Sequence, residues 1–159
     1  MVDGNASRVE FEIDHLAFAT VEGQFGGLSG TVEINRENLA QSRLKVCLEA
    51  ATVETGNDRR DRHLRGADFF EVEAHPQICF ESEDLFEREG ALYARGTLYM
   101  VGKKKELTVK LNYDNQQLQT TFTVNRRNWK IGESYPSFTI GEEVEIEVVL
   151  VIESLVDSP

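Results

Sequence analysis

The segment RVEFEID at residues 8–14 decides the fold class of this chain. Val9, Phe11 and Ile13 alternate with charged residues, and a period of two is the pattern of a β-strand with one buried face. The same period recurs along the chain, at residues 32–34, 44–50, 78–80, 98–100, 107–111, 118–124 and 144–153. An all-β protein is therefore predicted.

Turn-forming residues separate these segments at the spacing of β-hairpins. They lie at residues 26–27, 35–38, 89–90, 102–103, 113–115 and 141–142. The chain has 159 residues and only three prolines, and no repeat or linker divides it. We expect one domain over residues 1–159, built as an antiparallel meander that forms a barrel or a sandwich.

Composition and charge disfavour several partners. The 17 basic and 28 acidic residues give a net charge of −11, which repels nucleic acids and anionic lipid surfaces. The longest apolar run, at 148–152, is too short for an integral membrane segment. Residues 1–5 lack the basic and apolar parts of a signal peptide. This predicts a cytoplasmic chain, or a periplasmic or secreted one if a leader has been removed.

Two cysteines lie on the polar phase of their segments. Cys47 and Cys79 share no short motif and are too few for a disulfide framework. We predict exposed thiols and a reducing compartment, although a disulfide would form if the two strands were neighbours with suitable geometry.

Residues 55–72 depart from the two-residue period and predict a short helical insertion. Asp58 is expected to cap the amino terminus, Asp61 to lie in the first turn, and Gly66 to end the helix in a left-handed conformation. A second break, at 125–132, predicts another helical turn or an irregular crossing.

Several short motifs run nearly from end to end. The most specific is TGN at 55–57, which leads into RDxHLR at 60–65 and DFF at 68–70. The others are SxVxFxIxHL at 7–16, VxGxF with SGT at 21–31, HPxIxFxS at 75–82, GxL with a glycine at 96–102, NRxxW at 125–129 and IGEEV at 140–144.

In these motifs the chain resembles the YceI-like family of small lipid-binding proteins. The resemblance implies an antiparallel, lipocalin-like β-barrel whose long apolar interior holds a polyisoprenoid or similar long-chain lipid. It also implies a non-catalytic carrier without cofactors. Members of the family are often periplasmic or secreted and frequently dimeric, so a homodimer is one expected assembly.

The inward-facing residues are the candidate ligand contacts. From periodicity alone a filled core is the commoner use of such faces, whereas the resemblance favours a lipid cavity. We expect Phe11, Phe80 and Phe122 to line the tunnel, with Phe70 and Trp129 near its mouth. The other predicted contacts are Ile13, Val46, Leu48, Ile78, Leu98 and Met100.

Arginines of the helical block are candidate head-group contacts. Arg60 and Arg65 carry the planar donors that suit a phosphate or pyrophosphate. The alternative is that the arginines of this block form ion pairs with Asp58, Asp61 and Asp68, which lie at helical spacing.

Two other functions remain open at this point. A small barrel enzyme acting on a lipid-like substrate would use His63 and Asp61 for proton transfer. A filled barrel that serves protein interaction would use the apolar outer positions Val149 and Val151. The three histidines lie in separate segments without the spacing of a metal site, so neither a metal nor a catalytic residue is predicted.

Overall fold

The computed structural model describes residues 1–15, 19–136 and 139–153 of the chain. Nine strands within these residues form one antiparallel sheet, which confirms the all-β prediction. The strands are β1 (Arg8–His15), β2 (Ala19–Phe25), β3 (Ser29–Glu33), β4 (Arg43–Glu49), β5 (Gln77–Arg88), β6 (Ala91–Met100), β7 (Lys103–Asp114), β8 (Gln117–Asn125) and β9 (Ile140–Val151).

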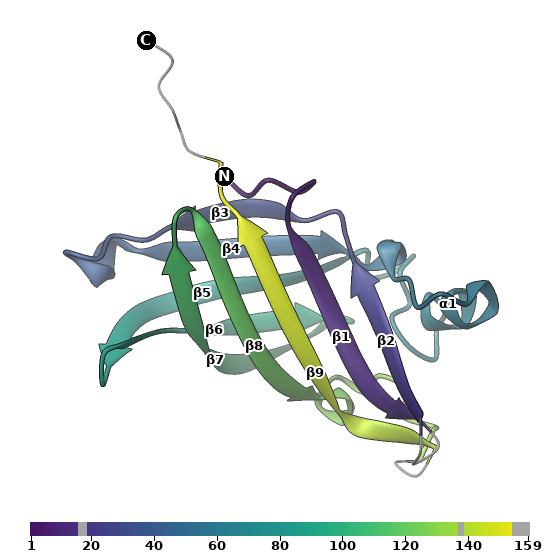
Figure 1. The fold of residues 1–159 in the computed structure, drawn as a ribbon. Coiled ribbons are helices and arrows are strands. Elements are labelled where there is room, and N and C mark those ends of the chain that lie inside the picture. The colour runs from purple at the N-terminus through teal and green to yellow at the C-terminus, as the bar shows by residue number, and fades with distance from the viewer. Residues whose placement is uncertain (16–18, 137–138, 154–159) are drawn as a thin grey trace.

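The sheet curls into a half-barrel in the order β2-β1-β9-β8-β7-β6-β5-β4-β3 (Figure 1). Its edge strands β2 and β3 follow each other in the chain. Beside β2, a short bridge joins Gln24 to Glu54, whose backbone groups exchange hydrogen bonds of 2.9 and 3.0 Å. At the end of β9, Val2 pairs with Ile152, so the amino-terminal segment also contributes to the curled sheet.

Strand β2 is not among the segments that the two-residue period predicts. It pairs with β1 along its whole length, and Gly23 lies opposite Phe11. A Cβ atom on Gly23 would clash with the Phe11 ring, so only glycine lets the ring lie across β2. Because Gly23 has no side chain, it interrupts the alternation of apolar residues by which the sequence would have predicted this strand.

Helix α1 (Asp58–Leu64) is shorter than the predicted insertion. The prediction that Asp58 caps it is wrong, because Asp58 is the first residue of the helix itself. The cap is Asn57, whose Oδ1 accepts a hydrogen bond of 3.0 Å from the backbone N–H of Arg60. The prediction for Gly66 is also wrong, because the helix ends at Arg65 in the right-handed region and Gly66 does not have a positive φ. Short 3-10 helices lie at η1 (Leu39–Gln41), η2 (Ala50–Thr52) and η3 (Arg126–Trp129).

Cys47 and Cys79 form a disulfide, so the prediction of exposed thiols is wrong. The two residues lie directly opposite each other on β4 and β5, with their Cα atoms 4.1 Å apart. The sequence pattern placed both on one face but not in register. The argument for a reducing compartment, which depended on free thiols, no longer applies.

Candidate ligand-binding cavity

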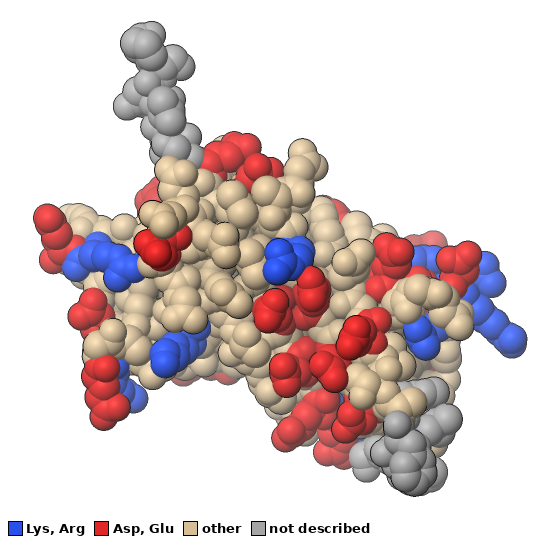
Figure 2. Space-filling view, in the orientation of Figure 1, with Lys and Arg blue, Asp and Glu red and all other residues tan. Residues whose placement is uncertain are grey.

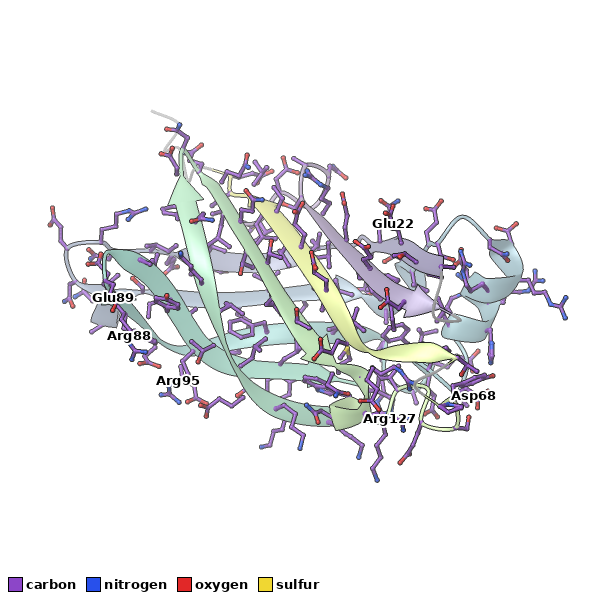
Figure 3. All side chains as sticks on the ribbon, turned by 60° about the horizontal axis from the view of Figure 1, so that its bottom comes forward. Glu22, Asp68, Arg88, Glu89, Arg95 and Arg127 are labelled. Carbon is purple, nitrogen blue, oxygen red and sulfur yellow. A yellow bond between two sulfur atoms is a disulfide. The ribbon has the colours of Figure 1, made fainter. Side chains whose placement is uncertain are left out.

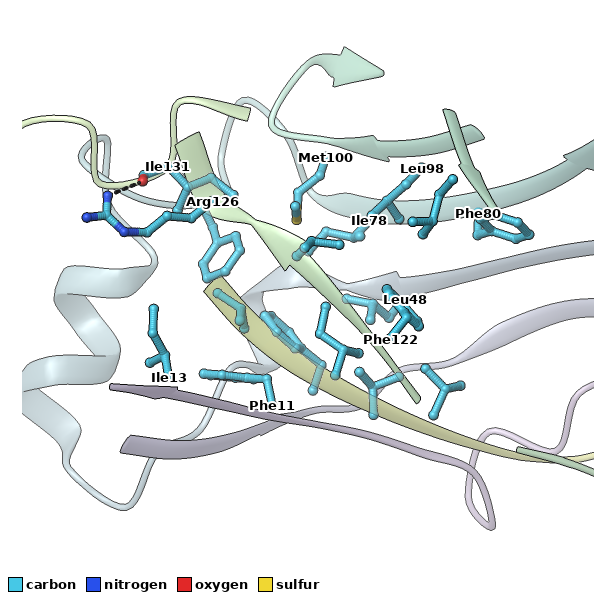
Figure 4. A pocket seen from close by; sticks show the side chains of 18 of the residues that line it. Phe11, Ile13, Leu48, Ile78, Phe80, Leu98, Met100, Phe122, Arg126 and Ile131 are labelled. Carbon is cyan, nitrogen blue, oxygen red and sulfur yellow. Dashed lines mark hydrogen bonds between the residues drawn. The ribbon is translucent and has the colours of Figure 1, made fainter. Parts of the chain in front are cut away.

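A cavity of about 500 Å³ runs inside the curled sheet (Figure 4). Every strand except β3 contributes to its wall, and most of the lining side chains are aliphatic or aromatic. The volume lies in the range of small-molecule sites, which extends from roughly 300 to 1,000 Å³. The interior is therefore hollow, and the alternative of a filled core is wrong.

Several interior side chains are only half-buried although they lie on the inner face of the sheet. Val46, Phe80, Phe122 and Ile146 belong to this group and line the cavity. Protein interiors are normally packed to crystal-like density, so accessible surface at inward positions means that the wall lacks packing partners. A ligand of the right shape would supply them.

Most of the predicted contacts lie in the cavity wall. Eleven do so, namely Phe11, Ile13, Val46, Leu48, Arg60, Phe70, Ile78, Phe80, Leu98, Met100 and Phe122. Trp129 and Arg65 are not part of the wall, and Trp129 is instead buried in η3 as part of the core. That the eleven touch a ligand stays a prediction.

One end of the cavity, the α1 end, is covered by aromatic side chains from three segments. Phe69 stacks on Tyr135 with ring centroids 5.4 Å apart, and His63 meets Phe69 edge-on at 5.0 Å. Phe70 packs edge-on against Phe25 of β2 at 5.3 Å. Helix α1, the turn after it and the loop after η3 thus form one cover over this end.

His63 and Asp61 do not form the pair that the enzyme alternative needs. The Nε2 atom of His63 lies 3.1 Å from the Asp68 carboxylate and 3.1 Å from the Tyr135 hydroxyl. Asp61 instead accepts hydrogen bonds from the backbone N–H and the hydroxyl of Thr55, at 2.9 and 2.5 Å. Each residue therefore holds the cover in place. The assignment of His63 and Asp61 as a proton-transfer pair is wrong, because their side chains bind other residues.

Arg60 lies in the cavity wall at the α1 end. Its Nε and Nη2 donate to the hydroxyl and carbonyl oxygens of Thr55, both at 2.7 Å. In the described part of the chain no ion pair joins Arg60 or Arg65 to Asp58, Asp61 or Asp68, so the alternative of ion pairs within the block is wrong. Arg60 thus places a cation in the wall of a mostly apolar cavity.

Arg126 is a second arginine of the wall, and the sequence analysis missed it. It is 3% exposed and donates five hydrogen bonds to backbone carbonyl oxygens between residues 131 and 141, at 2.6 to 3.0 Å. Burial, and then the charge of Arg127, lower its pKa below the ordinary value. Arg126 continues the inward phase of Phe122 and Val124, the signal by which it could have been found.

Charged side chains lie on the outside of the sheet (Figure 3). Arg95, for example, lies 2.7 Å from Glu83 and 2.8 Å from Asp84, and Asp84 is the main cause that raises its pKa. Carboxylates gather over β1 and β9 (Figure 2). In residues 1–15, 19–136 and 139–153, no group of histidine, cysteine and carboxylate side chains has the arrangement of a metal site.

The outer positions proposed for protein interaction are not a free apolar surface. Val149 is only 4% exposed. Backbone groups of Val151 hydrogen-bond to Asp3 and Ser7, so the amino-terminal segment lies along this strand. The sequence hint for an interaction surface is therefore wrong.

The fold and cavity define the class of antiparallel β-barrel proteins with an apolar internal cavity. Within that class, the chain belongs to the YceI-like domain family, whose pattern matches residues 1–152. A UPF0312 protein of Pseudomonas aeruginosa is 30% identical over 108 residues, which are 68% of this chain and 56% of the relative. The match thus spans little more than half the length of that curated relative.

Solved structures share the fold at low sequence identity. The crystal structure of Burkholderia cenocepacia BcnA has a TM-score of 0.87 and 22% identity, and the match covers 96% of this chain and 100% of that one. A polyisoprenoid binding domain from Saccharophagus degradans has a TM-score of 0.70 and 14% identity, with 94% of each chain covered. At these identities the likeness concerns the fold. Of the helices in the described residues, none has the length and apolar character needed to cross a bilayer.

Proposed function

We propose that this chain is a non-catalytic carrier that holds a polyisoprenoid or another long-chain amphiphile inside the barrel. The observation that carries the proposal is the hollow interior, whose wall is almost wholly apolar. The description of the Saccharophagus degradans neighbour as a polyisoprenoid binding domain supports the same ligand class. Each buried CH2 group contributes about 0.8 kcal/mol, so a long chain binds tightly without specific polar contacts.

The head group of this ligand is proposed to lie at the α1 end, near Arg60. The guanidinium has no hydrogen-bond partner at Nη1 among the described residues, since Nε and Nη2 both bind Thr55. A phosphate or pyrophosphate would accept a charge-assisted hydrogen bond there. The cover of α1 and Phe69 would then enclose the junction between head group and chain.

The Cys47–Cys79 disulfide supports an oxidising compartment for this function. Disulfides persist in the periplasm and outside the cell and are rare in the cytosol of most organisms. A hydrophobic carrier is useful in such a compartment because water separates the membranes and partners between which a lipid must move.

The test is a titration with prenyl alcohols and prenyl diphosphates of one to four isoprene units. We expect Kd to fall by about fourfold for each methylene-equivalent added, until the chain fills the cavity, because each group removes apolar surface from water. Isothermal titration calorimetry measures this directly. An affinity that does not change with length would contradict the proposal.

Arginine variants in the same titration test the head-group site. Arg60→Ala should raise the Kd of the diphosphates by roughly tenfold and leave that of the alcohols unchanged, because only the charged head group loses a hydrogen bond. Arg65→Ala is the matched control, since Arg65 lies outside the cavity wall. Equal losses for alcohols and diphosphates would refute a head-group role for Arg60.

A further inference from the structure

The inner face of the sheet is hollow over only part of its length. On strand β6, Leu98 and Met100 line the cavity. Farther back along the same face, Ala94 and Leu92 are 0% and 6% exposed, belong to the packed core and are not part of the cavity wall. On this side of the barrel the cavity therefore ends between Leu98 and Ala94.

The open part of β6 is the part nearest the α1 end. Gly102, just past the end of β6, lies against the ring of His75, and His75 belongs to the turns that follow α1 in the chain. Moving from Met100 to Leu98 and on to Ala94 thus leads away from the α1 end and into the closed part of the barrel.

Phe80 lies at the boundary between the hollow and the filled part. It is the register partner of Leu98, it lines the cavity, and it is only half-buried. In the view into the cavity, Phe80 lies at the end opposite Arg126 and Ile131 (Figure 4). Ile131 belongs to the loop after η3, which is part of the cover. Phe80 is therefore remote from the α1 end.

The position of Gly96 shows where the ring of Phe80 points. Gly96 lies two residues beyond Leu98 on β6, away from the α1 end, and opposite Ser82 of β5. A Cβ atom on Gly96 would come within 2.7 Å of Phe80 Cζ, so the tip of the ring rests on this glycine. The ring thus points about two residues, or roughly 7 Å, farther from the α1 end than its own register partner.

The strand that carries Phe80 is irregular at the same place. The register of β5 with β6 shifts between Ser82 and Asp84, immediately beyond Phe80. Such bulges are common beside functional sites, where they redirect a side chain. The Ser82 hydroxyl accepts a hydrogen bond of 2.8 Å from the backbone N–H of Leu44, which holds β5 against β4 at this point. The backbone beneath the ring is thus fixed.

We propose that Phe80 sets the upper length of the chain that the cavity accepts. Its ring fills the recess over Gly96, into which a longer chain would otherwise continue. Because Gly96 has no side chain, nothing but the ring occupies this recess. The inference rests on the proposed function, since it concerns the same cavity, and it narrows the ligand class to amphiphiles whose chain ends at Phe80.

The test is a titration with prenyl diphosphates of one to six isoprene units, in which the diphosphate keeps the longer chains soluble. In the native protein, Kd should fall with each added unit up to a limiting length and then stop falling. Phe80→Ala should move this limit to a chain about one unit longer, because the lost ring and an isoprene unit have similar volumes.

The largest effect is expected at the first length beyond the native limit. There Phe80→Ala should bind at least about tenfold more tightly than the native protein, because the added carbons then leave water. Calorimetry measures each Kd, and circular dichroism shows whether each variant is folded. If Phe80→Ala does not fold, Phe80→Leu removes part of the ring volume and should move the limit in the same direction.

Phe122→Ala is the matched control. Phe122 lines the same cavity from the middle of the β8 wall, with Leu118 on one side and Val124 on the other. Loss of its ring widens the cavity and does not lengthen it. Phe122→Ala should weaken the binding of every chain and leave the limiting length unchanged. The same shift in Phe80→Ala and Phe122→Ala would show that total volume sets the limit, and it would overturn the inference.

The remaining outcomes separate this inference from the proposed function. An unchanged limit in both Phe80 variants, with tight binding of the shorter chains, would overturn the role of Phe80 alone. A native Kd that keeps falling through six units would do the same, because the cavity would then have no end at Phe80. Failure of every diphosphate and every prenyl alcohol to bind the native protein would overturn the proposed function itself.

Discussion

Replacing Arg126 with leucine is expected to lower the free energy of unfolding by more than about 3 kcal/mol. The guanidinium donates to five backbone carbonyl oxygens, at Ile131, Gly132, Tyr135, Ile140 and Gly141. Leucine replaces only the first part of the arginine stem and has no donor, so the five carbonyl oxygens would lose this donor together, and only that of Tyr135 would keep a second arginine, Arg127, at 3.0 Å. Urea unfolding followed by circular dichroism measures the change.

Arg127→Leu is the control for this prediction. Arg127 is its sequence neighbour, with a side chain 34% exposed that lies 2.9 Å from the Glu142 carboxylate. An ion pair in contact with water contributes about 1 kcal/mol or less, so the loss should be small. Similar small losses for both variants would show that the carbonyl oxygens find other donors and that Arg126 does not hold the loop.

The second large effect is expected for Ile146→Trp, which should block the cavity. Ile146 lies on β9 between Phe11 of β1 and Phe122 of β8, and it is half-buried inside the barrel. The larger ring would occupy the space of at least two methylene groups of a bound chain. The Kd for a prenyl alcohol should then rise by at least roughly tenfold, as calorimetry would measure.

Stability distinguishes a filled cavity from a damaged core. Overpacking a dense core costs roughly 1 to 3 kcal/mol, whereas a side chain that enters empty space costs much less. Ile146→Trp should therefore unfold at nearly the native urea concentration. Glu145→Trp places the same ring on the exposed outer face. It should change neither the Kd for the prenyl alcohol nor the urea concentration at which the protein unfolds. Unchanged affinity in Ile146→Trp would place the ligand elsewhere.

Alternation was sufficient to predict the strands that have one apolar face, because a half-buried strand needs a side chain of each kind in turn. Alternation did not predict strand β2, because Gly23 stands at an apolar position of the strand and leaves room for the Phe11 ring. This contact depends on the neighbouring strand β1. For a related reason, the sequence left the disulfide only as the alternative to free thiols. Cys47 and Cys79 meet only through the register of β4 and β5, which no local pattern specifies.

The site could be predicted only in part. The inward phase identifies the residues that face the interior, but the same residues would line a packed core and a cavity. The volume that the curled nine-stranded sheet encloses decides between a packed core and a cavity. That volume depends on the curvature of the sheet. Arg126 was visible in the sequence as a polar residue that continues the apolar phase of Phe122 and Val124.

The most direct test of a ligand-bearing interior is mass spectrometry of the purified protein, first under native conditions and then after organic extraction. The account predicts a mass increment of one lipid per chain and an extract that contains a long-chain amphiphile. Ile146→Trp, purified in parallel, should carry little or none. A native protein that is free of lipid, and that also takes up none of the prenyl alcohols when they are added, would contradict the account.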